Sequence, residues 1–357
     1  LDDFDPASVV DAKSARRMDL SCLYGIAAAS SAVDDAGLDL SGIDTSRVGV
    51  AFGTSIGALG STLSSNDGFL SRGYRGAGLA GLLNSHIGAG SAEVACHLGV
   101  QGPAITVGSG SASSNDAIGY ALDAIALDRA DVMIAGGAEA PIIPLVWASM
   151  CLGRIMTRHN DEPARAMRPF DRDHDGPLLG EGAAFIVLES LGHARARGAR
   201  IYCAALGHGR SSEAHHPLAP HPEGKGPRAA MADALRRARR NADDVGYVNA
   251  HGTATVANDV AESLAIQQTF NGRNLAVSST KPVTGHLLGA AGALETVATA
   301  LALHHQAVPL TLNFDSAAPG CELDYVRGSS RSQALKVALN LSCGFGGTNS
   351  CLVLGAV

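Results

Sequence analysis

The chain has 357 residues, of which 46% are hydrophobic and only 17% charged, a composition that excludes a disordered protein and predicts a large buried core. Its formal net charge of −7 comes without a long basic tract, which argues against a nucleic-acid partner. No apolar stretch reaches transmembrane length without polar interruption, and none is typical of a signal peptide. The seven scattered cysteines include no C-x-x-C pair. We therefore expect a cytoplasmic protein that does not insert into a membrane and has neither disulfide bonds nor a metal site.

Short apolar runs alternate with helical patterns along most of the chain. Helices are predicted over Cys22–Ala36, Ala229–Arg240 and Leu287–His304. Strands are predicted over seven segments: Val48–Gly53, Ala104–Val107, Val132–Gly136, Phe185–Leu188, Tyr247–Ala250, Ala276–Ser279 and Val337–Leu341. This alternation predicts an α/β fold whose sheets are parallel and covered by helices.

The chain also shows a loose internal echo. A strand, a small-residue turn and an Ala/Gly-rich helix occur near residue 110 and again near residue 285, as a duplicated fold would produce. The charged segment GHARARGARI near residue 200 is the expected junction, which gives two similar halves, 1–200 and 201–357.

The segment ITVGSGSASSND (Ile105–Asp116) joins a predicted strand to an amphipathic helix. The helix is indicated by one apolar face, formed by Ile118, Ala121, Leu122 and Ile125. Ser111 therefore lies near a helix N-terminus, where free N–H groups and the helix dipole stabilise negative charge. It is either an N-capping serine or a reactive one. The G-x-S-x-G motif of α/β-hydrolases is absent, because Ser109 and Ser113 occupy its glycine positions.

Two segments of the second half carry polar groups at the ends of predicted strands. YVNAHGTATVANDVAE places His251 directly after a strand, and Asp259 and Glu262 open the next helix. SSTKPVTGHLLGAAGALE places Lys281 just past a strand and His286 at the start of an Ala/Gly-rich helix. Because an open α/β sheet binds its ligands at the carboxyl ends of its strands, we expect these groups to share one site.

A third segment, NLSCGFGGTNSCLVL, is a predicted hairpin whose Gly344, Gly346 and Gly347 permit unusual backbone angles and close approach to a ligand. Together with RPFDRDHDGPLLGEGAAFIVLE (Arg168–Glu189), these segments closely resemble the β-ketoacyl-acyl carrier protein synthases of the thiolase superfamily. The resemblance covers essentially the whole chain. It fits the elongating type of fatty acid and type II polyketide synthesis better than the initiating type, which has a Cys-His-Asn triad.

The resemblance implies a thiolase-like, five-layered αβαβα fold with mixed, mostly parallel sheets in two similar halves. It also implies a dimer, either a homodimer or a heterodimer with a chain-length-factor-like subunit. In this family a cysteine takes an acyl chain from an acyl carrier protein as a thioester. Malonyl-carrier protein then loses carbon dioxide, and its enolate attacks that thioester. The substrates arrive on the phosphopantetheine of the carrier protein, so no resident cofactor is implied.

The family's functional residues match positions of this chain, with Ser111 at the nucleophile position. His251 and His286 match the histidines that donate hydrogen bonds to the malonyl thioester oxygen, where enolate charge develops. Lys281 matches the lysine that supports His286, and Asp259 and Glu262 match the acidic pair that orders the network. The backbone N–H groups of Ser111 and Phe345 match the oxyanion hole.

The remaining matches concern the substrate and the carrier protein. Thr253 and Thr255 match the threonines that contact the pantetheine arm, and Cys343, Gly344 and Gly346 lie on the substrate side. The segment AKSARRMD matches the place where the family docks its carrier protein, with the basic residues Lys13, Arg16 and Arg17.

Ser111 departs from the family pattern, which has a cysteine at this position. A serine hydroxyl stays protonated, holds an acyl group as a less reactive oxyester, and has no evident third group as its base. We therefore expect slow elongation. Two explanations stay open: an engineered Cys→Ser change made to trap a complex, or a natural serine in a synthase that decarboxylates or transfers without elongating. Chain-length-factor subunits also lack the nucleophile, but they typically lack the catalytic histidines that this chain keeps.

Further departures lie near the expected substrate path. Cys343 stands where the family commonly has a phenylalanine gate, and it is either a smaller gate or a buried structural cysteine. Leu218 replaces a threonine often used to hold the pantetheine arm. His215, His216 and His221 have no acidic or thiol partner near in sequence, so we expect no metal there.

Overall fold

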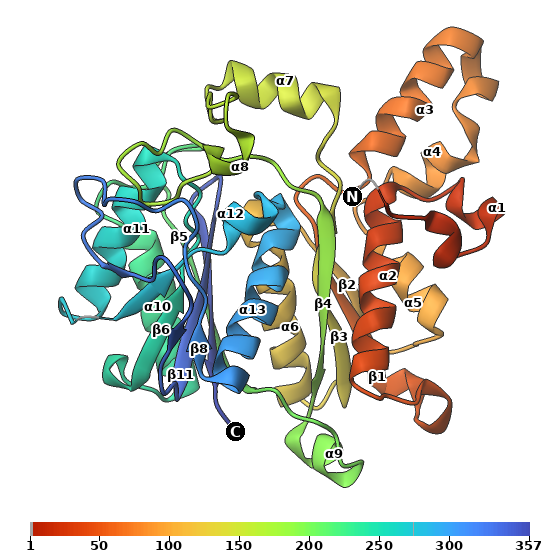
Figure 1. The fold of residues 1–357 in the computed structure, drawn as a ribbon. Coiled ribbons are helices and arrows are strands. Elements are labelled where there is room, and N and C mark those ends of the chain that lie inside the picture. The colour runs from red at the N-terminus through yellow and green to blue at the C-terminus, as the bar shows by residue number, and fades with distance from the viewer. Residues whose placement is uncertain (1–2, 274) are drawn as a thin grey trace.

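The computed structural model describes residues 3–273 and 275–357 and contains two main sheets (Figure 1). The first has the strand order β2-β1-β3-β4 and consists of β1 (Val48–Gly53), β2 (Ala104–Val107), β3 (Val132–Glu139) and β4 (Gly182–Glu189). The second has the order β5-β12-β11-β6-β7-β9 and consists of β5 (Ala204–Ser212), β6 (Val245–Asn249), β7 (Ala276–Ser278), β9 (Asp324–Tyr325), β11 (Val337–Gly344) and β12 (Thr348–Gly355). A small ribbon pairs β8 (Ala307–Val308) with β10 (Arg331–Ser332).

Helices cover both sheets and fill the space between them. In Figure 1, the middle layer is formed by α6 (Ser113–Ala126) and α13 (Ala291–His305). The outer face of the first sheet is covered by α2 (Leu20–Asp35) and α5 (Ala89–Leu98). The outer face of the second sheet is covered by α10 (Lys225–Ala238) and α11 (Val256–Thr269). The shorter or peripheral helices are α1 (Ala12–Ala15), α3 (Leu59–Arg72), α4 (Gly78–Asn84), α7 (Pro144–Leu152), α8 (Pro163–Ala166), α9 (Leu191–Ala196) and α12 (Lys281–Thr284). The five layers confirm the αβαβα fold class.

Strand directions are mixed but mostly parallel, as the resemblance implies. β1 pairs in parallel with β2 and β3, and β6 pairs in parallel with β7 and β11. The antiparallel pairs of the two main sheets are β3–β4, β11–β12 and β5–β12, and the β8–β10 ribbon is antiparallel as well. Every residue of β1 and β3 is buried, which is why these strands appear in the sequence as continuous apolar runs rather than as alternating patterns.

Each of the seven predicted strands is present, and the predicted hairpin is the β11–β12 pair. The prediction for Leu287–His304 was wrong at its start, because a short turn (Leu288–Ala290) precedes α13. β5 was not predicted. β4 belongs to the first sheet and β5 to the second, so the chain passes from one sheet to the other between these strands. The division into two halves, 1–200 and 201–357, stays a prediction. Within the described ranges, no helix combines the length and the apolar character needed to cross a membrane.

Candidate active site

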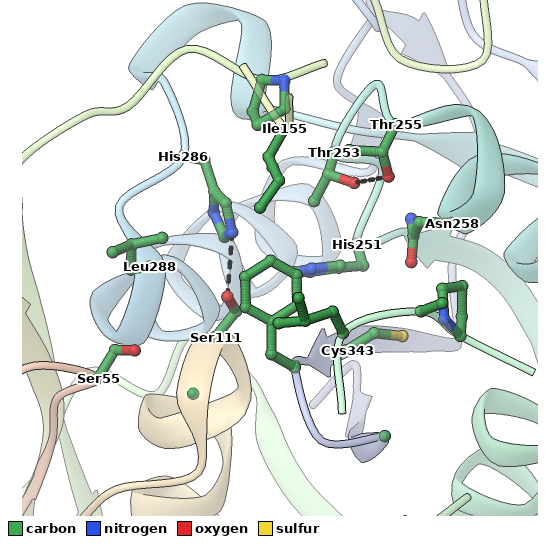
Figure 2. Close-up of a pocket in the computed structure, with 18 of the residues that line it drawn as sticks. Ser55, Ser111, Ile155, His251, Thr253, Thr255, Asn258, His286, Leu288 and Cys343 are labelled. Atoms are coloured by element: carbon green, nitrogen blue, oxygen red, sulfur yellow. Dashed lines mark hydrogen bonds between the residues drawn. The ribbon is translucent and has the colours of Figure 1, made fainter. Parts of the chain in front are cut away.

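Many of the residues singled out in the two predicted halves meet in one pocket at the carboxyl ends of the parallel strands, whereas Lys281 and Asp259 lie behind its lining. The pocket has a volume of about 260 Å³ and is lined by Ser111, His251 and His286, among others. Ser111 comes from the turn before α6, His251 follows β6, and His286 lies between α12 and α13. Figure 2 shows the three side chains turned toward one another.

The turn that carries Ser111 is a short 3₁₀ segment, Gly110–Ala112, and α6 starts directly after it. Gly110 has a φ of 60°, which favours glycine. Ser111 does not cap α6; its Oγ lies 3.0 Å from Nε2 of His286 instead (Figure 2). The expectation that no group stands ready as a base for this serine was therefore wrong. The two residues are too far apart in the chain for their contact to be visible in the sequence.

His251 is held as a neutral hydrogen-bond donor. Nζ of Lys281 lies 3.3 Å from Nδ1 of His251 and also bonds its backbone carbonyl and Glu295. An ammonium group has only donors, so Nδ1 of His251 must accept and the proton of the neutral ring must sit on Nε2. Burial, Lys281 and the neighbouring imidazole lower the pKa of His251 well below its ordinary value. We expected Lys281 to support His286; its hydrogen bonds run to His251.

His286 is also neutral, but its tautomer is not fixed by a neighbour. Burial and the charge of Lys281 lower the pKa of His286 well below its ordinary value. Its Nδ1 is buried and, within the described residues, has no hydrogen-bond partner. Nε2 can therefore accept a proton from Ser111 or donate one to it. The rings of His251 and His286 stand edge to face with centroids 5.4 Å apart, and both line the pocket.

Two buried carboxylates order the segment around His251. Glu262 accepts hydrogen bonds from the backbone N–H groups of His251 (2.5 Å) and Gly252 (2.8 Å), and burial raises its pKa to about 7. Asp259 accepts the backbone N–H of Phe170 (2.7 Å) and lies 2.9 Å from Nδ1 of His174. Asp259 therefore joins the Arg168–Glu189 segment to α11.

The proposed oxyanion donors belong to two backbone segments in contact. A Cβ placed on Gly344 would lie 3.2 Å from the nitrogen of Ser111, and one on Gly110 would lie 3.6 Å from the nitrogen of Phe345. Oγ1 of Thr348 donates to the carbonyl of Ser109 over 3.1 Å, which ties the hairpin to the turn. A larger residue at Gly344 would push the segments apart.

The other side of the pocket is formed by Thr253, Thr255, Asn258 and Cys343 (Figure 2). The hydroxyl oxygens of the two threonines lie 3.0 Å apart. Cys343 both lines the pocket and packs against the core of the second sheet, and burial raises the pKa of its thiol well above the ordinary value. A protonated thiol is a poor nucleophile, so Cys343 does not replace Ser111 in that role.

Some expected residues lie outside this pocket. Gly346 does not line it; its N–H donates to the carbonyl of Pro217 (2.7 Å), while Leu218 does line the pocket. Lys13, Arg16 and Arg17 are exposed in and after the short helix α1.

Nor do the three clustered histidines form a metal site. The rings of His215 and His221 lie 4.8 Å apart, and Nδ1 of His216 accepts backbone N–H groups. Across residues 3–273 and 275–357, no group of His, Cys, Asp or Glu side chains is arranged to hold a metal ion.

Sequence reasoning missed Glu139 and Glu295, two carboxylates that support the site. Glu139, at the end of β3, accepts hydrogen bonds from Oγ1 of Thr54 (2.7 Å) and from the N–H groups of Ser55 (2.6 Å) and Gly289 (2.8 Å). Burial raises its pKa to about 7. Each of these residues is an isolated charge in an apolar segment, and that signal could have identified both.

A second omission is the apolar wall formed by Val146 and Met150 of α7 and by Ile155. Sequence analysis assigned no element to α7. These apolar side chains line the same pocket as Ser111, His251 and His286, so the cavity offers both an apolar surface that suits an acyl chain and polar groups that suit a carbonyl.

Comparisons with known proteins identify the family to which this chain belongs. The family model described as "Beta-ketoacyl synthase, N-terminal domain" matches residues 1–194, and the one described as "Beta-ketoacyl synthase, C-terminal domain" matches residues 202–315. A 3-oxoacyl-[acyl-carrier-protein] synthase 2 from Coxiella burnetii is 41% identical, with 99% of this chain and 86% of the relative covered.

Solved structures share the fold. A ketosynthase/chain length factor, that of ishigamide, superposes with a TM-score of 0.92 at 33% identity, over 99% of this chain and 86% of the other. A type II polyketide acyl-carrier protein in complex with its ketosynthase, bound to the hexaketide, gives a TM-score of 0.89 at 33% identity, over 94% of this chain and 85% of the other. The chain therefore belongs to the β-ketoacyl synthase family.

Proposed function

We propose that this chain is a carrier-protein-dependent ketosynthase of fatty acid or type II polyketide synthesis that decarboxylates malonyl-carrier protein and elongates slowly because of Ser111. One observation carries the proposal: the buried rings of His251 and His286 stand edge to face with centroids 5.4 Å apart, and Nε2 of His286 lies 3.0 Å from Oγ of Ser111. Nε2–H of His251 and a protonated Nε2 of His286 donate to the thioester oxygen as malonate loses carbon dioxide. This converts the carbonyl oxygen into an enolate oxygen that two fixed donors stabilise.

The relatives support the partners in this proposal. One neighbour is a ketosynthase in complex with an acyl-carrier protein, and another is a ketosynthase/chain length factor. We propose that this chain also takes its substrates from an acyl carrier protein, on phosphopantetheine that passes Thr253 and Thr255, and needs no resident cofactor. Lys13, Arg16 and Arg17 remain the proposed docking segment, and their exposure leaves them free to attract an acidic partner.

Malonyl-carrier protein tests the decarboxylation directly. The purified chain should convert it to acetyl-carrier protein, followed by intact mass. Loss of one oxyanion donor typically costs about 10²–10³ in rate, so His286→Ala should slow the conversion by that order. His97→Ala, at an exposed histidine of α5, is the matched control and should change nothing. Conversion by His286→Ala at the wild-type rate would contradict the proposal.

The proposed defect in elongation has a separate test. Ser111→Cys should give β-ketoacyl product from an acyl donor and malonyl-carrier protein, because a thioester is more reactive than the oxyester of a serine. If the serine form already elongates as fast as the cysteine form, the proposed role of Ser111 is wrong, while the decarboxylation result stands.

A further inference from the structure

The hydroxyl of Ser111 has a partner that can take its proton. Its Oγ lies 3.0 Å from Nε2 of His286, within the distance expected for a nucleophile and its general base. Because His286 is neutral, Nε2 has a free lone pair at neutral pH in one of its tautomers. A serine that is inert on its own becomes a usable nucleophile in this arrangement.

The backbone fixes the position of His286. Its N–H donates to the carbonyl of Leu178 (2.8 Å), and its carbonyl accepts the N–H of Gly180 (3.0 Å). The preceding Gly285 has a φ of 73°, which favours glycine. Nδ1 meets no carboxylate among the described residues, so the arrangement is a Ser–His pair rather than a three-residue relay.

The surroundings suit acyl transfer. The N–H groups of Ser111 and Phe345 belong to the two backbone segments in contact, where a tetrahedral oxyanion would form beside Oγ. Val146, Met150 and Ile155 give an apolar wall for the chain of the acyl group. Nucleophile, base, oxyanion donors and an acyl pocket are thus present together.

We propose that Ser111 and His286 remove the acyl group from a thioester as an oxyester on Ser111 and then release it to water, a thioesterase activity beside decarboxylation. In the first step the Oγ–C bond forms, the C–S bond breaks, and the proton of Oγ passes through Nε2 to the leaving thiol. In the second step Nε2 takes a proton from water, the water oxygen forms a bond to the ester carbon, the C–Oγ bond breaks, and Nε2 returns the proton to Oγ. The products are a carboxylic acid and a thiol.

This inference rests on the proposed function only for the source of the acyl group, so a small donor tests it alone. Mixing the chain with hexanoyl-pantetheine should release a burst of one thiol per site, followed by slow turnover. Intact mass and peptide mapping should place one hexanoyl group on Ser111. The adduct should survive neutral hydroxylamine, whereas the adduct of Ser111→Cys should be cleaved, because a thioester is the more reactive of the two.

Variants separate the base from the nucleophile. Ser111→Ala should show no burst, and His286→Ala should acylate about 10²–10⁴-fold more slowly. Ser64→Ala and His97→Ala, at exposed positions, are the matched controls and should behave as wild type. The wild-type acylation rate should be constant above pH 6.5, because His286 is neutral there. It should fall only in more acidic solution.

Three results would overturn the inference: no adduct on the wild type while Ser111→Cys is acylated, an adduct at another residue, or wild-type acylation by His286→Ala. Each of these can occur while malonyl decarboxylation persists. Failure of the inference is therefore distinguishable from failure of the proposed function.

Discussion

His286 has a single Nε2 atom to share between Ser111 and a substrate. When Nε2 accepts the serine proton, it cannot donate to an enolate oxygen, so nucleophile activation and decarboxylation require opposite tautomers. His251 has no such choice, because Lys281 restricts its Nδ1 to accepting. Acylation removes the proton from Ser111 and leaves Nε2 of His286 only the donor role. In the proposed mechanism, the acyl-enzyme is therefore the form that decarboxylates malonate.

This competition predicts a gain of activity. Ser111→Ala removes the hydrogen bond that holds Nε2, which is worth about 0.5–1.5 kcal/mol. Decarboxylation of malonyl-carrier protein should therefore rise roughly 2- to 10-fold, as measured by acetyl-carrier protein formation. The double variant with His286→Ala is the control and should show no such rise. A slower Ser111→Ala would mean that the hydroxyl itself assists decarboxylation.

At the scale of the elements, the start of α6, directly after the Ser111 turn, packs on glycines of the two inner strands of the first sheet. A Cβ on Gly53, at the end of β1, would lie 2.4 Å from the backbone nitrogen of Ser114, and one on Gly137 of β3 would lie 2.8 Å from Cβ of Ser114. The N-terminus of α6 can therefore approach the strands only because these positions lack side chains. The position of Ser111 depends on this close contact.

Gly53→Ala should consequently lower both the free energy of unfolding and the rate at which Ser111 is acylated. Overpacking typically costs 1–3 kcal/mol, and here the obstacle is backbone that cannot rotate away. We expect a lower urea midpoint and slower acylation of Ser111. Gly192→Ala in α9 is the matched control, since its Cβ would meet nothing within 4 Å and alanine favours a helix. Equal midpoints for the two variants would disprove the role given to Gly53.

The same close packing explains what sequence could and could not predict. The buried strands β1 and β3 are mainly apolar runs, and β11 is apolar except for Asn340 and Ser342, so their positions were predictable. β5 was missed because Gly207 and Gly209 lower its strand propensity, yet a Cβ on Gly209 would lie 2.2 Å from the nitrogen of Ala234 in α10. Gly209 weakens the strand pattern in the sequence, yet the close packing of β5 against α10 requires a glycine there.

The candidate site was likewise predictable from the sequence only in part. The segments with His251 and His286 were predicted as its members, because each follows a strand and matches a family motif. The contact between His286 and Ser111, the bond of Lys281 to His251 and the wall from α7 were not predictable, because each joins groups distant in the chain. Local patterns carry no information about which distant side chain fills a particular contact.

At the scale of the whole molecule, the candidate site takes side chains from both of the predicted halves. Ser111 comes from the half with the first sheet, and both histidines come from the half with the second. The middle layer contains α6 from one half and α13 from the other, and Ser114 Oγ accepts the N–H of Ala293 across their contact (2.8 Å). Neither half alone holds a complete site.

Within the described residues, β2 pairs with no strand on its outer side. β2 is the outer strand of the first sheet, and the carbonyls of Pro103 and Val107 accept the N–H groups of Val50 and Thr54. Because the backbone N–H and C=O groups of alternate residues in a strand point to opposite sides, those of Ala104 and Thr106 point away from β1. An open strand edge favours pairing with another strand, and two copies related by a two-fold axis would pair their β2 strands antiparallel.

We therefore expect the chain to sediment as a dimer at micromolar concentration. Ala104→Pro removes one outward N–H and should shift the sample toward monomer, because proline cannot donate to the new ladder. Ala104→Gly keeps that N–H and is the matched control, so it should remain dimeric. A wild-type monomer would contradict the dimer itself. A dimer that is equally stable in both variants would place the interface elsewhere on the surface, since an interface built on β2 must lose a hydrogen bond when its donor is removed.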